Sequence, residues 1–377
     1  MAQPPAVPAV ARRILALARK DRAAAERAFA ELAPDAQLAL VCETPLAQRV
    51  DLLELSRQPE RLIPALPEAE LVFTVKALGL ADAGWILAHA SPEQVQTCVD
   101  LDAWNGPLPD RAKFGEWLAA LAEGGDEALL RAARSIDPEL LMLWLAEIAE
   151  VHLKQGDDPG WQAPAGGQSI DGVFFLVARQ SDDDLQLALR LLALLFEDDY
   201  WFYFRLLQSV PWESTADNEE FALRWRSGRL ADLGFPPREE ALAIYTAPRR
   251  DELELPSEPP PPIGEWHLPV WLPELPGAAG SPHLLFRAAA ELDDEARRAL
   301  FYAFVSLANQ VAVADDLSLG DAESLPKSIE KAAELASRGL AWLSERHRVA
   351  PAEVLRRTPL LRLFRVGFRL DRDRSPA

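Results

Sequence analysis

The residues best suited to binding chemistry are three arginines and an aspartate in the segment RWRSGRLADLGFP, namely Arg224, Arg226, Arg229 and Asp232. Guanidinium groups bind carboxylates and phosphates through paired hydrogen bonds, so one interpretation is an anion clamp. Arg229 and Asp232 are three residues apart, a spacing that brings side chains together on a helix. We favour this second interpretation, an internal ion pair, because such pairs are common in helical proteins.

One polar residue lies within an apolar stripe. Asn309 follows Val305 by four residues and precedes Ala312 by three, so the three share a helix face. A buried amide needs hydrogen-bond partners. Asn309 is therefore predicted to fix the register of its helix, with contact to a ligand as the alternative. An enzyme with an unfamiliar site would require Arg226, Arg229 and Asn309 to converge in one pocket.

Acidic residues gather in five short clusters, and carboxylate oxygens are the ligands that Mg²⁺ and Ca²⁺ prefer. None of the clusters has the alternating pattern of a twelve-residue calcium loop. Several precede apolar helices, where carboxylates cap free amides and complement the helix dipole. We favour the capping role over a cation site. The clusters are Asp157-Asp158, Asp182-Asp183-Asp184, Glu197-Asp198-Asp199, Asp293-Asp294-Glu295 and Asp315-Asp316.

Histidine and cysteine do not have the spacing of a metal site or a nucleophile. His89 and Cys98 are nine residues apart, but no further ligands accompany them as a zinc site requires. Cys42 and Cys98 are the only cysteines, and each is predicted to be a small apolar core residue. The sequence has no P-loop, dinucleotide fingerprint, HExxH or nucleophile elbow, so we expect no cofactor and no metal.

Composition favours a soluble acidic protein. The 39 Lys and Arg against 59 Asp and Glu give a net charge of −20, which disfavours nucleic acid and anionic membranes and favours a basic or uncharged partner. No segment offers the about 18 uninterrupted apolar residues of a membrane span. The N-terminal residues lack the order of a signal peptide, and two cysteines provide no disulfide framework. We therefore expect a cytoplasmic protein.

The elements that must position these residues are short helices. A capping residue, Pro and an acidic or small residue recur before apolar stripes, as at Thr44-Pro45, Ser91-Pro92 and Asp137-Pro138. Leu71, Val75 and Leu78 share one face and lead to Gly79, a helix terminator. Helices this short cannot bury an apolar stripe alone, so they must stack. The sequence predicts an all-α fold, with an irregular superhelix of stacked helices and a C-terminal helical bundle.

Four regions are predicted along the chain: 1–155 is the short-helix superhelix, 156–245 is helical with a short strand or hairpin near 171–179, 246–282 is a Pro-rich linker or strap, and 283–377 is helical. Because Trp266, Val270, Trp271 and Leu272 are apolar, part of the Pro-rich region is expected to lie against a folded surface. The last helix carries Arg362, Arg365 and Arg369 on a polar face, predicted to be solvated, with partner or membrane docking as the alternative.

Several phrases resemble a bacterial family of uncharacterised proteins known as a domain of unknown function: SGRLADLGFPPREEALAIY, LANQVAVADD and RTPLLRLFRVGFRL. That resemblance implies no activity. The segment LIPALPEAELVFTVKALGLADAGWILAHASPEQVQTCVDL is similar to the helical repeats of the cytoplasmic domain of MgtE-type magnesium transporters and to flagellar motor-switch helical domains. This second resemblance implies a right-handed superhelix of short helices, although the chain lacks the transporters' membrane spans and nucleotide domain.

These observations favour a cytoplasmic helical scaffold or adaptor that binds another protein through its superhelical surface, and they favour a non-enzyme. Two alternatives are kept. A divalent-cation-responsive regulator would use the acidic clusters. An enzyme would use an unrecognised site around the arginines and Asn309.

Overall fold

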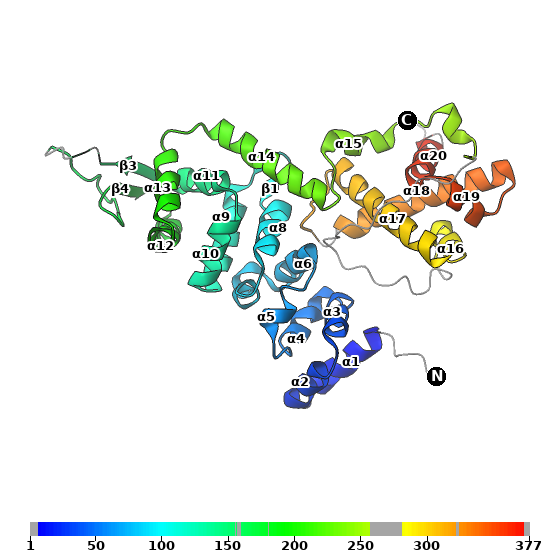
Figure 1. Cartoon of the computed structure of the whole chain (residues 1–377), viewed down its shortest axis with the longest axis horizontal. Helices are drawn as coiled ribbons and strands as arrows, with labels where there is room; N and C mark the ends of the chain where they lie inside the picture. Colours follow the sequence, from blue (N-terminus) through cyan, green and yellow to red (C-terminus); the bar gives the residue numbers. More distant parts are fainter. Residues whose placement is uncertain are drawn as a thin grey trace. The chain divides into compact units, whose positions relative to one another are not determined.

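The computed structural model describes residues 7–154, 156, 160–179, 181–256, 281–321 and 324–372. In this part of the chain the structure has twenty α-helices and two small antiparallel sheets of two strands each (Figure 1). The prediction of a predominantly all-α protein with one short strand pair is confirmed.

Local sequence signals place several helix ends. Ser91 and Gln94 form a reciprocal capping box at the start of α8 (Pro92–Asp102), and Asp110 accepts from the Lys113 amide at the start of α9 (Arg111–Glu123). Gly79 ends α6 (Glu68–Leu78) with a φ of +100°, which glycine adopts without strain. Thr44 does not cap a helix. Its hydroxyl donates back to the Leu40 carbonyl, and Pro45 precedes α4 instead.

The chain divides into two compact units, with the division between Arg226 and Ser227 inside α14 (Thr215–Asp232). The first unit also contains α1 (Val7–Ala18), α2 (Arg22–Ala30), α3 (Pro34–Cys42), α4 (Leu46–Leu53), α5 (Pro59–Leu62), α6, a short 3₁₀ turn η1 (Leu80–Asp82), α7 (Gly84–Leu87), α8, β1 (Trp104–Asn105), β2 (Leu108–Pro109), α9, α10 (Asp126–Ser135), α11 (Pro138–Ile148), β3 (Ala149–Leu153), β4 (Phe174–Ala178), α12 (Asp182–Asp198) and α13 (Tyr200–Ser209).

Aromatic packing and a buried ion pair stabilise the first unit. Phe114 and Trp144 meet edge to face with ring centroids 6.3 Å apart, joining α9 to α11. Arg49 and Glu70 form an ion pair of 2.5 Å in which both side chains are buried. Arg49 also donates to the carbonyls of Cys42 and Thr44, so this arginine ties the end of α3 to α4 and α6.

The strand predicted near 171–179 is observed as β4, which pairs antiparallel with β3. Strand β3 has no distinct strand signal, because its residues directly follow the apolar stripe of α11 and continue its hydrophobic character. Phe174 on β4 is fully buried and makes edge-to-face contacts with Tyr203 and Phe204 of α13. The strand pair thus provides apolar surface for the last helices of the first unit.

The second unit contains the end of α14, then α15 (Arg238–Leu242), the 3₁₀ turns η2 (Ala243–Tyr245) and η3 (Arg250–Leu253), α16 (Leu284–Ala289), α17 (Asp294–Ala314), α18 (Ser324–His347), α19 (Pro351–Arg357) and α20 (Leu360–Arg372). Its core lies where α17, α18 and α20 pack together (Figure 1). Val311, Leu340 and Leu363 are among the fully buried residues at this centre.

The arginine face of α20 does more than contact solvent. Arg362 donates to the Glu254 carbonyl and Arg365 to the Ala243 carbonyl, so α20 holds the backbone of the segment that leads from α15 into the Pro-rich region. His347 of α18 contacts the Leu253 carbonyl at 3.0 Å and adds a further attachment. Trp266, Val270, Trp271 and Leu272, predicted to lie against a folded surface, are outside the described residues.

Candidate functional site

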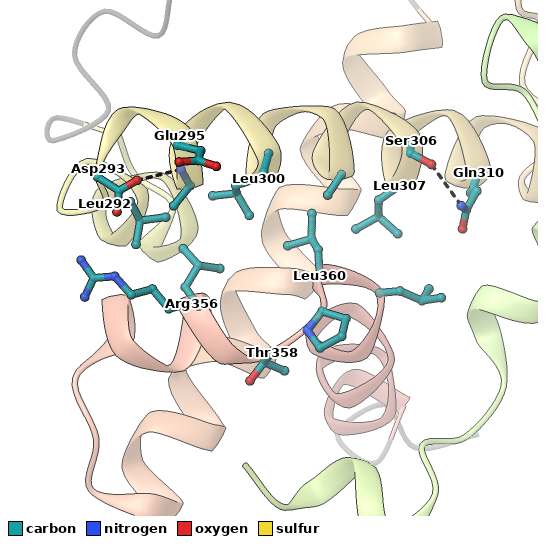
Figure 2. A pocket seen from close by; sticks show the side chains of 16 residues that line it. Leu292, Asp293, Glu295, Leu300, Ser306, Leu307, Gln310, Arg356, Thr358 and Leu360 are labelled. Atoms are coloured by element: carbon teal, nitrogen blue, oxygen red, sulfur yellow. Dashed lines mark hydrogen bonds between the residues drawn. The ribbon is translucent and has the colours of Figure 1, made fainter. Parts of the chain in front are cut away.

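A cavity of the second unit lies between α17 on one side and the junction of α19 and α20 on the other (Figure 2). Its volume is about 780 Å³, within the range of cavities that bind drug-sized ligands. Most of its lining is leucine and alanine, and the charged residues stand at one end. The cavity is partly open, since Leu300 and Leu361 in its walls retain some exposure to solvent.

The α17 wall is built from a regular stripe of small side chains. Its members follow one another at intervals of three, four, three and four residues, so they share one face of the helix. Small side chains leave the backbone of α17 accessible to a close neighbour. The stripe consists of the small residues Ala296, Ala299, Ala303 and Ser306 and ends at the longer Gln310, and it is flanked by Leu292, Leu300 and Leu307.

The opposite wall is formed where α19 ends and α20 begins. Thr358 adopts an extended conformation after α19, and Pro359 then starts the turn into α20, which brings Leu355 and Leu360 to the cavity. Thr358 is buried, and its hydroxyl has no hydrogen-bond partner among the described residues. A buried hydroxyl without a partner costs free energy, so this wall has unused hydrogen-bonding capacity.

Charged groups mark the end of the cavity where α17 begins (Figure 2). The Asp293 carboxylate accepts from the Ala296 amide at 2.9 Å, and this bond, helped by the charge of Arg356, lowers the pKa of Asp293. Arg356 is itself paired with Glu353 at 3.5 Å and donates to the Glu291 carbonyl. Glu295 is exposed and has no ion-pair partner in the described part of the chain.

At the other end, Gln310 donates to the Ser306 hydroxyl at 3.3 Å (Figure 2). The same two side chains also line a second cavity of about 380 Å³, whose other lining residues come from the end of α14, the turn that follows it and α15. Asp232 and Glu240 are the charged residues of this second cavity. The two cavities therefore adjoin along α17, and together we call them the α17 trough.

The residues predicted to carry chemistry lie on α14 and α17. Arg226 donates to the Asp100 carbonyl at 2.7 Å and lies over the Trp104 ring, so it attaches α14 to neighbouring backbone of the first unit. Arg224 is exposed, and Arg229 lies in the second unit.

Asp232 lines the trough and has no ion-pair partner among the described residues, so the predicted pair with Arg229 is not formed there. Asn309 is only 6% exposed on α17, next to Gln310 of the trough.

The lining of the trough is suited to binding. Its described lining combines apolar side chains with four carboxylates, one arginine and a few hydroxyl and amide groups, and contains no histidine, cysteine or lysine. Across the described residues, no three His, Cys, Asp or Glu side chains converge to hold a metal ion. Nor does any helix there have the length and apolar character needed to cross a membrane.

The trough was missed by sequence reasoning because its stripe is inconspicuous. The large apolar residues of this helix, such as Phe304, Val305 and Val311, dominate its pattern and are buried in the core. Alanine contributes little to a hydrophobic stripe, so the face with Ala296, Ala299 and Ala303 does not indicate a binding surface in the sequence. The available signal was the three-four spacing of small residues on a helix whose opposite face was already apolar.

A model for a family of unknown function (DUF6178) matches residues 26–373 of the chain. No curated protein and no solved structure matches.

Proposed function

The chain belongs to this family of unknown function, and we propose that it is a helical adaptor that holds an apolar segment of another protein in the α17 trough. The observation that carries the proposal is the trough itself, a partly open cavity with leucine and alanine walls and polar groups at its ends. A partner that covered these walls would remove apolar surface from water, and each Å² of apolar surface buried contributes about 25 cal/mol to the binding free energy.

The position of the trough supports binding of a segment instead of a small molecule alone. It extends along α17 from Asp293 to Gln310 and continues to Asp232. An elongated, open site lined by helices is the usual receptor for a peptide segment that presents apolar side chains on one face.

The first unit offers surface of the kind that adaptors use for additional contacts. Phe221 and Trp225 are four residues apart on α14, and both are exposed, as is Trp212 in the turn before this helix. Tryptophan and other aromatic residues are enriched at protein interfaces because one rigid side chain buries a large area. Two binding surfaces on separate compact units would let the chain bring two partners together.

The proposal is tested by selecting ligands from a displayed library of helical and extended peptides on the full chain. Selected peptides are then measured against Ala303→Trp, which fills the trough, and against Ala216→Trp, the same substitution at an exposed position of α14. We expect peptides that lose at least about tenfold in affinity with the first variant and keep it with the second, a difference of about 1.4 kcal/mol. Peptides that bind both variants equally would contradict the adaptor proposal.

A folding control accompanies these variants. Thermal unfolding followed by circular dichroism should show that Ala303→Trp retains helical content. Ala299→Trp fills the same trough one turn away and should give the same loss of peptide binding.

A further inference from the structure

We infer that the segment held in the α17 trough is a basic amphipathic α-helix of a partner protein; this inference rests on the function proposed above and names the chemistry of the ligand. Three observations carry it: the spacing of the small residues on the α17 wall, the length of the trough, and the charges at its two ends.

The spacing of the small residues on the α17 wall favours a helical ligand. Positions that alternate at intervals of three and four residues form the seam along which two helices pack side by side. On α17 this seam is occupied by small side chains at Ala296, Ala299 and Ala303, which allow a second helix to approach closely. Large apolar residues on the ligand would then fill the space that these alanines leave, against Leu355 and Leu360 of the opposite wall.

The geometry also disfavours an extended ligand. A strand-like peptide gains affinity by adding backbone hydrogen bonds to an exposed sheet edge. Every described lining residue of the trough lies on a helix or in the turns next to one, so no such edge is present among them. Asp293 and Gln310 are seventeen positions apart, which corresponds to about 26 Å along a helix. A partner helix of about 17 residues would match that length.

The charges at the ends require positive residues on the ligand. Glu295 stands at one end, and Asp232 and Glu240 stand at the other; all three are exposed and have no ion-pair partner among the described residues. The only basic residue of the described lining is Arg356, which is already paired with Glu353. In a chain of net charge −20, this acidic rim attracts Lys and Arg on both ends of a ligand.

A second copy of the chain is a poor source of this helix. Its basic amphipathic helices include α1 and α20, and their apolar faces are already buried, as Ile14 and Phe364 show. Displacing either helix would expose the core of its own unit. The helix is therefore assigned to another protein.

The test uses two synthetic helical peptides of about 18 residues with the same leucines at alternating three- and four-residue intervals. One carries Lys and the other Glu at the flanking positions. Fluorescence anisotropy measures the binding of each to the full chain at about 50 mM and about 300 mM salt. We expect the Lys peptide to bind at least about tenfold more tightly at low salt, with a smaller difference at high salt.

Charge reversal gives the matched comparison. Asp232→Lys combined with Glu295→Lys should reduce binding of the Lys peptide and increase binding of the Glu peptide. Glu213→Lys combined with Glu220→Lys adds the same charge at exposed positions of the first unit and should leave the preference for the Lys peptide in place. Reduction by both double variants alike would overturn the inference, because the attraction would then be nonspecific.

Failure of the inference is distinguishable from failure of the adaptor proposal. Equal binding of the two peptides, each lost in Ala303→Trp, would overturn the basic-helix inference and leave the adaptor proposal standing. Absence of Lys-peptide binding would also overturn the inference. The adaptor proposal would still be tested separately by the library selection. Concentration-dependent dimers that Ala303→Trp abolishes would overturn it in favour of a second copy. Binding of dodecylamine but not of the Lys peptide would overturn it in favour of a small amphipathic cation.

Discussion

Gly339 of α18 and Gly367 of α20 lie against each other's helix backbone in the core of the second unit. A Cβ atom on Gly339 would stand 1.9 Å from the Leu363 carbonyl oxygen, and one on Gly367 would stand 1.8 Å from the Leu335 carbonyl oxygen. Neither position accommodates any side chain while the helices keep this spacing. The two glycines therefore allow α18 and α20 to pack backbone to backbone, and the start of α20 forms part of one wall of the α17 trough.

Gly339→Ala and Gly367→Ala should each destabilise the second unit by about 3 kcal/mol or more. The added methyl group would meet backbone atoms, which cannot move aside without separating the helices. Chemical unfolding followed by circular dichroism measures the change. Gly228→Ala is the matched control, because a Cβ there meets nothing within 4 Å and alanine favours the helix. Equal stability of Gly339→Ala and the wild type would show that the helices do not pack this closely.

Breaking the buried pair Arg49–Glu70 should destabilise the first unit by about 3 to 5 kcal/mol. Glu70→Ala leaves the guanidinium of Arg49 buried without its carboxylate partner, and a buried charge without a partner is costly. Arg22→Ala, which removes an exposed pair with Glu54 at 3.3 Å, should cost less than about 1 kcal/mol and serves as the comparison. Urea unfolding of the two variants measures the change in the free energy of unfolding. A small loss of stability in Glu70→Ala, similar to that in Arg22→Ala, would contradict burial of the Arg49 pair.

Stability should fall as pH rises above about 9. Burial is the main cause that raises the pKa of Cys42 from its ordinary 9.0 to about 12, so between these values the native thiol keeps its proton while the unfolded thiol loses it. Proton loss then favours the unfolded state. Unfolding free energies at about pH 8 and pH 10 should differ less in Cys42→Ala than in the wild type. An identical pH dependence in the two proteins would contradict this role for Cys42.

Removing the arginines of the α20 polar face should loosen the segment that follows α15. Arg362 and Arg365 donate to the carbonyls of Glu254 and Ala243, so Arg362→Ala with Arg365→Ala withdraws both attachments. Limited proteolysis should then cut near residues 246–256 several-fold faster than in the wild type. Arg372→Ala near the exposed end of the same helix is the control. Unchanged cleavage in the double variant would show that other contacts hold this segment.

The helices were predictable because their signals are local. The capping box at Ser91 and the terminator at Gly79 depend on residues within one turn, so their chemistry can be read directly from the sequence. Strand β3 was not predictable, since its pairing with β4 joins segments separated by more than twenty residues. Thr44 also escaped prediction, because its hydroxyl found the Leu40 carbonyl in the preceding turn.

The trough was not predictable for a related reason. Its two walls include Ala303 of α17 and Leu360 of α20, which are more than fifty residues apart in the sequence. Neither alanine nor leucine indicates a binding site by itself. The arginines were candidates for anion binding because guanidinium groups bind anions, yet the guanidinium of Arg226 donates to the Asp100 carbonyl. Of the three arginines, Asp232 and Asn309, only Asp232 lies in the lining of the trough, where Asp293 and Glu295 of one acidic cluster also lie.

The most direct test of the central claim is photo-crosslinking from inside the trough. A benzophenone side chain is introduced in place of Leu300, in the α17 wall, and in a second protein in place of Trp225, on the exposed face of α14. Each protein is irradiated with the Lys-rich helical peptide and analysed by mass spectrometry. We expect a peptide adduct from position 300 and none from position 225. Adducts from position 225 alone, or from neither position, would show that the peptide does not bind in the trough.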